Sequence, residues 1–151
     1  MSVREIIQEG NIILRLKADK IEIFDKNLHA LLDDMHETMI SANGIGLAAP
    51  QIGISKRVIV VSTNEDEKIE IVNPEIVKFS GMQIGQEGCL SVDSSKNGNV
   101  KRPSKITVKG FDRNGKKILI RAKDLTARAL CHEIDHLNGI LFIDKLEPAT
   151  E

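Results

Sequence analysis

The stretch CHEIDHLNGI, residues 131–140, places two histidines four positions apart, with a glutamate directly after the first. At about 100° per residue, an α-helix projects His132 and His136 from one face, where both imidazoles can bind one ion. Glu133 lies beside that pair, where a carboxylate can shuttle protons to and from a metal-bound water. Asp135 flanks the other side and either supports the histidines or serves the fold alone. The alternative is a buried helix with structural histidines.

The helix that carries this motif is predicted over about residues 125–138 and is expected to form the centre of the fold. Asp124 is a candidate N-cap, and Asn138 with the glycine after it marks the end. Leu125 and Ala129 lie on the stripe that leads to the first histidine, so an apolar wall runs toward the ligand pair.

A second helix is predicted over residues 25–42, with Asp25 as its N-cap and a leucine and methionine stripe as its buried face. His29 and His36 lie off that stripe. We expect both to be solvated edge residues rather than metal ligands.

The rest of the chain is rich in short strand-like segments. Four runs of β-branched residues predict strands at 57–62, 69–73, 105–111 and 116–122. A hairpin turn is predicted at 112–115, a polar loop at 93–99 and a closing strand at 140–144. Because the strands come in a run, the predicted fold class is α+β, with antiparallel β-sheets packed around a central HExxH-bearing helix and the N-terminal helix on the outside. No linker divides residues 1–151, which predicts a single domain.

The composition narrows the possible functions. Twenty-one basic and 22 acidic residues give a net charge of −1, so composition gives no support for nucleic-acid binding. No apolar run suits a signal peptide or a membrane span. Cys89 and Cys131 are expected to be free thiols in a reducing, cytoplasmic compartment.

A catalytic metal site needs a third protein ligand and one open position. No histidine follows His136, and Cys131 projects away from the histidine face. Cys89, which follows a glycine in EGCLS (87–91), is therefore the favoured third ligand. The alternative is a buried structural cysteine.

The segment GIGLAAPQ, residues 44–51, is made mostly of small residues. It permits the close approach of an extended peptide, which could pair with it by strand addition. Gln51 could direct its amide N–H at an oxyanion. The alternative is a glycine-rich loop that follows a helix.

Together, GIGLAAPQ (44–51), EGCLSV (87–92) and HEIDHLNGILF (132–142) resemble the peptide deformylase family over roughly residues 3–146. The resemblance implies a metal-dependent hydrolase that removes the formyl group from the formyl-methionine of newly synthesised proteins and releases formate. It implies one divalent metal ion, with Fe²⁺ as the native ion and Zn²⁺, Ni²⁺ or Co²⁺ able to occupy the site.

The resemblance also assigns roles to individual residues. Cys89, His132 and His136 would hold the metal, and Glu133 would act as general acid and base while metal-bound water attacks the formyl carbon. The Gln51 amide and the Leu90 backbone N–H would stabilise the oxyanion. The residues that would line or flank the substrate cleft are Ile45, Gly46, Glu87, Gly88, Leu125 and Ala129.

Several positions depart from the family pattern. Cys131 stands where a glutamine is usual, and the segment GNIILR lacks the usual proline. In the 93–99 loop Asp93 replaces a proline. The arginine that the family pattern has after EGCLS finds no clear match before Arg102, which leaves Lys96 as the candidate basic residue for substrate-backbone contacts.

The expected partners are N-formyl-Met nascent peptides and, transiently, the ribosome, through a surface other than a long C-terminal helix. Direct contact with nucleic acid or a membrane is not expected, and a monomer is. Two rival functions remain open at this point: a zincin-like endopeptidase, and a non-catalytic metal-binding or peptide-binding module.

Overall fold

The computed structural model describes residues 2–148 and contains two antiparallel sheets and two α-helices. The larger sheet has the strand order β1-β2-β3-β6-β7, formed by Gly46–Ala48, Val58–Val61, Ile69–Ser80, Lys105–Phe111 and Lys117–Lys123. The smaller sheet pairs β4 (Gln83–Glu87) with β5 (Gly98–Arg102). The helices are α1 (Lys26–Ser41) and α2 (Asp124–Leu137).

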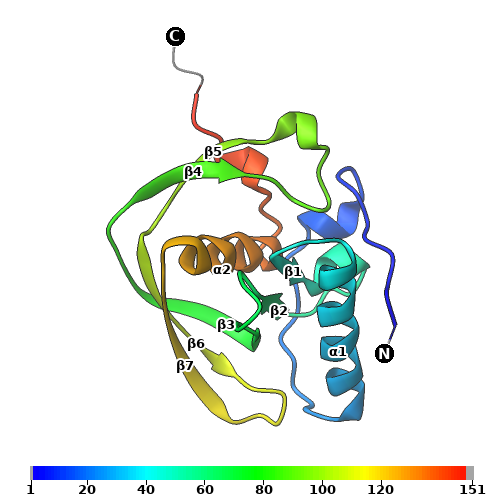
Figure 1. Ribbon diagram of the computed structural model, residues 1–151. Helices are drawn as coiled ribbons and strands as arrows, with labels where there is room; N and C mark the ends of the chain where they lie inside the picture. Colours follow the sequence, from blue (N-terminus) through cyan, green and yellow to red (C-terminus); the bar gives the residue numbers. More distant parts are fainter. Residues whose placement is uncertain (1, 149–151) are drawn as a thin grey trace.

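Helix α2 lies between the two sheets, with the β4–β5 ribbon above it and the larger sheet below it in Figure 1. Its apolar face packs on the larger sheet, where Leu130 and Leu137 join a buried cluster that includes Ile59, Ile71 and Val108. Burial of each such side chain stabilises the fold by about 1.5–3 kcal/mol. The predicted α+β arrangement, with antiparallel sheets around the motif-bearing helix, is confirmed.

Helix α1 lies on the outside of the larger sheet, on the right in Figure 1. Its predicted stripe of leucines and methionines packs on β1 and β2 through Leu32, Met35 and Met39. The Asp25 side chain accepts hydrogen bonds from the backbone N–H groups of Asn27 and Leu28, as expected of an N-cap.

The two histidines of α1 are not solvated as predicted. His36 is buried, and its Nε2 lies 3.1 Å from Glu70 Oε1. His29 is half-buried, and its Nε2 lies 2.8 Å from the backbone carbonyl oxygen of Arg113. His36 thus contacts strand β3, and His29 contacts the turn between β6 and β7.

The start of α2 also differs from the prediction. Asp124 does not cap the helix; it is the first helical residue, with φ +54°, and Lys123 stands at the N-cap position without a side-chain bond. The Asp124 N–H donates to the Ser104 carbonyl at 2.9 Å, and its own carbonyl accepts from Gln83 at 2.8 Å. These tertiary bonds hold the backbone in place of a cap. The predicted end is confirmed, with Asn138 as C-cap.

The predicted closing strand at 140–144 is wrong. Phe142–Lys145 form a short 3-10 helix, in which the Asp144 carboxylate accepts a hydrogen bond from the Leu141 N–H at 3.0 Å. Leu141 and Phe142 are fully buried. The apolar run therefore marks a buried turn that covers the end of α2, not a strand.

Strands β1, β4 and β5 were not predicted, and β3 was predicted too short. Strand β3 continues to Ser80 beyond Pro74, and the ladder to β6 shifts register between Val72 and Glu75. Such an irregularity accommodates a proline, which has no N–H to donate. Gly98 and Asn99, predicted as loop, begin β5. Of the helices in the described part of the chain, none is both long and apolar enough to span a membrane.

Candidate metal centre and active-site cleft

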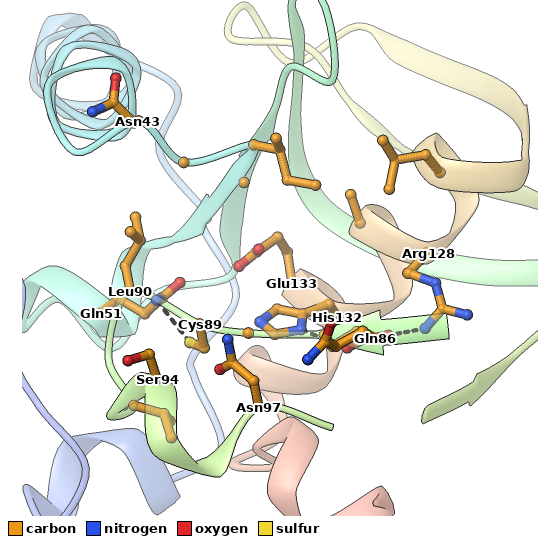
Figure 2. A pocket seen from close by; sticks show the side chains of 18 residues that line it. Asn43, Gln51, Gln86, Cys89, Leu90, Ser94, Asn97, Arg128, His132 and Glu133 are labelled. Carbon is orange, nitrogen blue, oxygen red and sulfur yellow. Dashed lines mark hydrogen bonds and ion pairs between the residues drawn. The ribbon is translucent and has the colours of Figure 1, made fainter. Parts of the chain in front are cut away.

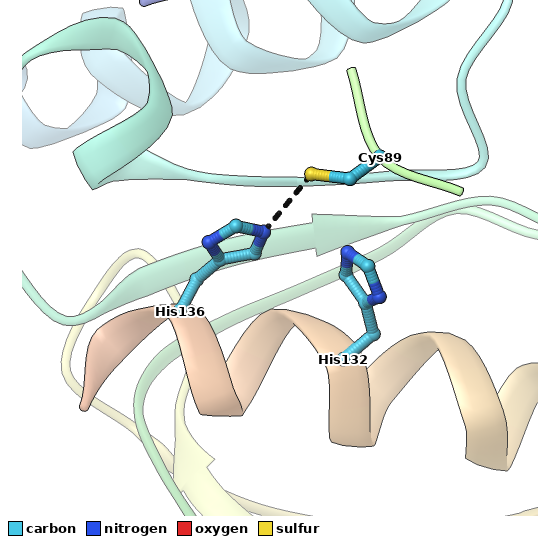
Figure 3. Close-up of side chains that lie close together, drawn as sticks. All are labelled: Cys89, His132 and His136. Carbon is cyan, nitrogen blue, oxygen red and sulfur yellow. Dashed lines mark hydrogen bonds between the residues drawn. The ribbon is translucent and has the colours of Figure 1, made fainter. Parts of the chain in front are cut away.

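Three potential ligands meet beside α2. Cys89, just after β4, and His132 and His136, on one face of α2, place one donor atom each within 4.8 Å of one another. Cys89 Sγ lies 3.3 Å from His136 Nε2, as Figure 3 shows. The structure therefore brings together the three residues predicted as metal ligands.

The donor set fits a divalent metal ion of intermediate softness. With usual metal–sulfur and metal–nitrogen bonds, a tetrahedral site places sulfur and nitrogen roughly 3.6 Å apart, close to the distance between Cys89 and His136. The Glu87 carboxylate can only accept, so His132 Nδ1 donates to it at 2.9 Å and Nε2 is left as the donor atom for an ion. One thiolate and two imidazoles suit Fe²⁺, Co²⁺, Ni²⁺ or Zn²⁺ better than Mg²⁺ or Ca²⁺.

The charge around the histidines favours a cation. Burial alone would lower the pKa of His132, but Glu133, Cys89 and Glu87 outweigh burial and raise it to about 10. Burial and the neighbouring His132 lower the pKa of His136 well below its usual value. The surroundings of His132 thus favour a positive charge, and a divalent ion would replace the proton on this histidine.

Glu87 is held in a buried network. Its carboxylate accepts two hydrogen bonds from Arg102, both at 2.9 Å, and one from Arg128 at 2.5 Å, besides the bond from His132. Burial alone would raise the pKa of Glu87, but His132 and Arg102 lower it to about 2. Glu87 was predicted to line or flank the cleft. It does line the cleft, but its carboxylate is bonded to His132, Arg102 and Arg128 and is not free to contact substrate.

The same network answers the open question about Asp135. Its carboxylate lies 2.6 Å from Arg102 Nη1 and 2.9 Å from Lys145 Nζ. Asp135 therefore fixes the arginine that holds Glu87, and so supports the histidine indirectly. Arg128 was missed in the sequence, although an arginine inside the apolar stretch of a buried helix signals a paired charge.

A cleft of about 360 Å³ opens in front of the cluster, between β1, the segment after β4 and α2 (Figure 2). Its lining includes every predicted cleft residue, namely Ile45, Gly46, Glu87, Gly88, Leu125 and Ala129. Gln51, Cys89, Leu90, His132 and Glu133 also line it. His136 lies behind Cys89 and is fully buried.

Glu133 is buried at the inner end of the cleft. Its Oε1 has no hydrogen-bond partner in the described part of the chain, and burial raises its pKa to about 7. A carboxyl group with a pKa near neutrality can both accept and donate a proton under working conditions. Gly46 faces this carboxylate so closely that a Cβ at that position would collide with Glu133.

Two further hydrogen-bond donors belong to residues that line the cleft. Ala48 N–H donates to Gln51 Oε1 at 2.9 Å, so the amide nitrogen of Gln51 turns toward Cys89 Sγ, 3.5 Å away, and Ser91 Oγ, 3.2 Å away. The backbone N–H of Leu90 donates to no acceptor within residues 2–148. Preorganised donors of this kind stabilise a negatively charged oxygen.

The unusual 93–99 loop contributes neutral polar side chains to the cleft. Ser94 and Asn97 line it, whereas Lys96 forms an ion pair with Glu9 at 2.5 Å and lies outside the lining. This position gives no support to a contact between Lys96 and the substrate backbone, which stays an untested expectation. Asp93, which replaces the usual proline, accepts a hydrogen bond from the Ser95 N–H at 2.8 Å and so caps a short 3-10 turn.

The second cysteine does not belong to the site. Cys131 is buried in the core between α2 and the larger sheet, and burial raises the pKa of its thiol to about 11. It projects away from the histidine face, as predicted. Neither Cys89 nor Cys131 forms a disulfide.

Comparison with known proteins agrees with this geometry. The family model described as polypeptide deformylase matches residues 3–151. A protein of Halothermothrix orenii named peptide deformylase is 53% identical over 147 residues, which cover 97% of this chain and 95% of that protein.

Solved structures are also similar. A peptide deformylase from Thermotoga maritima has a TM-score of 0.94 and 35% identity, covering 98% of this chain and 100% of that chain. A class I type b peptide deformylase from Acinetobacter baumannii, bound to Met-Ala-Ser, has a TM-score of 0.90 and 39% identity, covering 97% and 100%. With the family model matched over nearly its whole length, and relatives this similar in sequence and fold, the chain belongs to the peptide deformylase family.

Proposed function

We propose that Cys89, His132 and His136 hold one divalent metal ion, and that the cleft in front of it is where the formyl group leaves the substrate. As a member of its family, the chain is a metal-dependent enzyme that removes the N-terminal formyl group from formyl-methionine of new proteins and releases formate. The observation that carries the site assignment is the free, buried Glu133 oxygen beside the only cysteine–histidine cluster that residues 2–148 contain.

We propose Fe²⁺ as the native ion, with Zn²⁺, Ni²⁺ or Co²⁺ able to take its place. The mixed thiolate and imidazole donor set supports this range. When bound, such an ion polarises a carbonyl oxygen and lowers the pKa of water. An iron site with a thiolate ligand is also open to oxidation, because Cys89 can itself be oxidised.

The chain's own residues perform the proton transfers. Glu133 takes the proton from the attacking water and passes it to the amine nitrogen as the bond between the formyl carbon and that nitrogen breaks. The products are formate and a free amine, so the proton that the water loses ends on the leaving group. Gln51 and the backbone N–H of Leu90 stabilise the negative oxygen of the tetrahedral intermediate.

The substrate lies extended along β1. This strand is at the edge of the larger sheet, so one side of its backbone is free to pair with a peptide. Ile45 and Leu125, respectively 41% and 48% exposed, give apolar walls for the methionine side chain. Support comes from the similar Acinetobacter baumannii structure, which is bound to a peptide that begins with methionine.

The wider setting is also part of the proposal. Residues 1–151 act as one catalytic domain, monomeric and cytoplasmic, whose partners are N-formyl-Met nascent peptides and, transiently, the ribosome.

The test compares two carboxylates that each have a buried oxygen without a partner, Glu133 in the cleft and Glu37 on α1. Glu133→Gln is expected to keep the metal and to lose formate release from formyl-Met-Ala-Ser by at least about 10²-fold, since general acid–base catalysis contributes about 10²–10⁴-fold. Glu37→Gln should keep both. Full activity in Glu133→Gln would refute the assignment, and cleavage of internal peptide bonds without formate release would point to an endopeptidase.

A further inference from the structure

The outer face of the larger sheet is strongly basic. Along β6 and β7, exposed residues alternate with buried or half-buried residues that pack into the core with α2, and β3 ends in four exposed residues. We define the basic face by six exposed cations on these strands: Lys78, Lys105, Lys109, Lys117, Arg121 and Lys123. They form one patch, although they are spread over 46 positions of the sequence.

The strand register brings these cations together. Lys78 lies opposite Thr107, and Thr107 lies opposite Arg121, so two cations flank one threonine across three strands. One pleat further along, Lys105 lies directly opposite Lys123. Two residues along a strand cover about 6.8 Å and neighbouring strands lie about 4.8 Å apart, so the four cations form a compact cluster.

This cluster has no neutralising carboxylates. A shallow groove on the sheet is lined by Lys78, Lys105, Arg121 and Lys123 and by no acidic residue. None of the four forms an ion pair with a residue of the described range 2–148. The only carboxylate that faces outward among them is Glu75, 3.6 Å from Lys109 at the far end. Like charges this close repel one another, and an anionic partner would relieve that repulsion.

Protection of the sheet edge does not explain the pattern. Lysines on an edge strand prevent pairing with other chains, and this accounts for those on β7. Lys78 lies on the part of β3 that extends beyond its last pair with β2, so edge protection accounts for it as well. Lys105, however, lies on β6, which at this position pairs with β3 on one side and with β7 on the other. Its positive charge, and the cluster that it forms with its neighbours, therefore require another explanation.

We propose that the basic face binds the phosphate backbone of RNA. Repeated phosphates complement a cluster of unpaired cations, and they do so without reading sequence. The whole-chain charge of −1 concealed this surface, because the cations gather on one face while acidic residues lie elsewhere.

The placement leaves the cleft free. In Figure 1 the β3–β6–β7 part of the sheet lies on the opposite side of α2 from β4 and β5, whereas the cleft opens between α2, β1 and the segment after β4. The chain can therefore bind RNA and a peptide at the same time. If the proposed substrate is correct, such binding would hold the enzyme on the RNA-rich particle that makes the peptide.

The test measures binding of a fluorescent RNA hairpin by anisotropy, from about 50 to 200 mM salt, with the metal-loaded full chain. The variant Lys105→Gln/Arg121→Gln/Lys123→Gln removes three cations of the basic face. A matched control, Lys20→Gln/Lys26→Gln/Lys68→Gln, removes three exposed lysines that form no ion pair within the described residues. Formate release from a free tripeptide shows that each variant is folded, since neither set of residues touches the cleft.

The expected result is a loss of RNA affinity on the order of tenfold or more in the first variant, with the slope of log affinity against log salt reduced by about two to three. The control should keep both the affinity and the slope. Equal losses in both variants would mean that only net charge matters and would overturn the proposal. The proposal would also be overturned if the unmodified chain did not bind RNA. The same holds if it bound phosphatidylserine vesicles through these cations but did not bind RNA.

Discussion

Replacement of Glu87 by glutamine should weaken both the metal site and the fold. Within residues 2–148, Glu87 is the only acceptor of the His132 Nδ1 hydrogen, and it also pairs with Arg102 and Arg128. Glutamine has nearly the same shape, so the change removes a charge and leaves the packing almost intact. The effects on metal binding and on folding can therefore be measured separately.

The magnitude follows from the burial of the network. The Glu87 and Arg102 side chains are only 4% and 3% exposed, and removal of one partner of such a buried pair typically costs about 3–5 kcal/mol of unfolding free energy. Loss of the charged acceptor behind a metal-binding histidine typically lowers metal affinity by about 10–100-fold. Glu87→Gln should show both effects.

The control is Glu70→Gln. Glu70 also pairs with an arginine and a histidine, Arg113 and His36, but on the side of the sheet that faces α1. This variant should lose stability without losing metal affinity. The two quantities are measured by urea denaturation of the metal-free proteins and by competition with a chromophoric chelator. If Glu87→Gln folds and binds metal as tightly as the unmodified chain, Glu87 does not position the histidine.

Three further predictions follow from single contacts. Gly46→Ala should lower the rate of formate release by at least about 10²-fold with metal content unchanged, because the added Cβ displaces the Glu133 carboxylate. Normal activity in this variant would show that the carboxylate has room to move. Phe142→Ala should lower the unfolding free energy, measured by urea denaturation, by about 3–5 kcal/mol, because this fully buried ring stacks on His132 with the ring centroids 6.0 Å apart. A loss below about 1 kcal/mol would contradict that packing. Burial alone would raise the pKa of Glu70, but Arg113 and His36 lower it to about 2, so the stability that the Glu70 carboxylate contributes is present above pH 4.5 and is lost as the pH falls toward 2. In Glu70→Gln the unfolding free energy should therefore depend less on pH between 4.5 and 2. An unchanged pH dependence would argue against the ion pair.

The metal cluster could be predicted from the sequence because its pattern is local. His132 and His136 are one helical turn apart, and the spacing alone fixes their shared face. Cys89 required a different argument, the lack of any other ligand, and the structure places it beside the pair. The chemical roles assigned to these residues stay predictions until they are measured.

The supporting contacts could not be predicted in the same way. Arg128 and Glu87 are 41 positions apart, and no periodicity connects them. The apolar run at 140–144 suited a strand as well as a buried turn, and only the space at the end of α2 decided between them. The basic face follows from strand register, which a single sequence does not specify.

The most direct test of the metal assignment compares the two cysteines. Cys89→Ala and Cys131→Ala are purified without oxygen, and bound metal and formate release are measured on the same samples. We predict about one ion per chain with full activity in the unmodified chain and in Cys131→Ala, and loss of both in Cys89→Ala. A Cys89→Ala protein that holds a full equivalent of metal and releases formate at the normal rate would contradict the assignment.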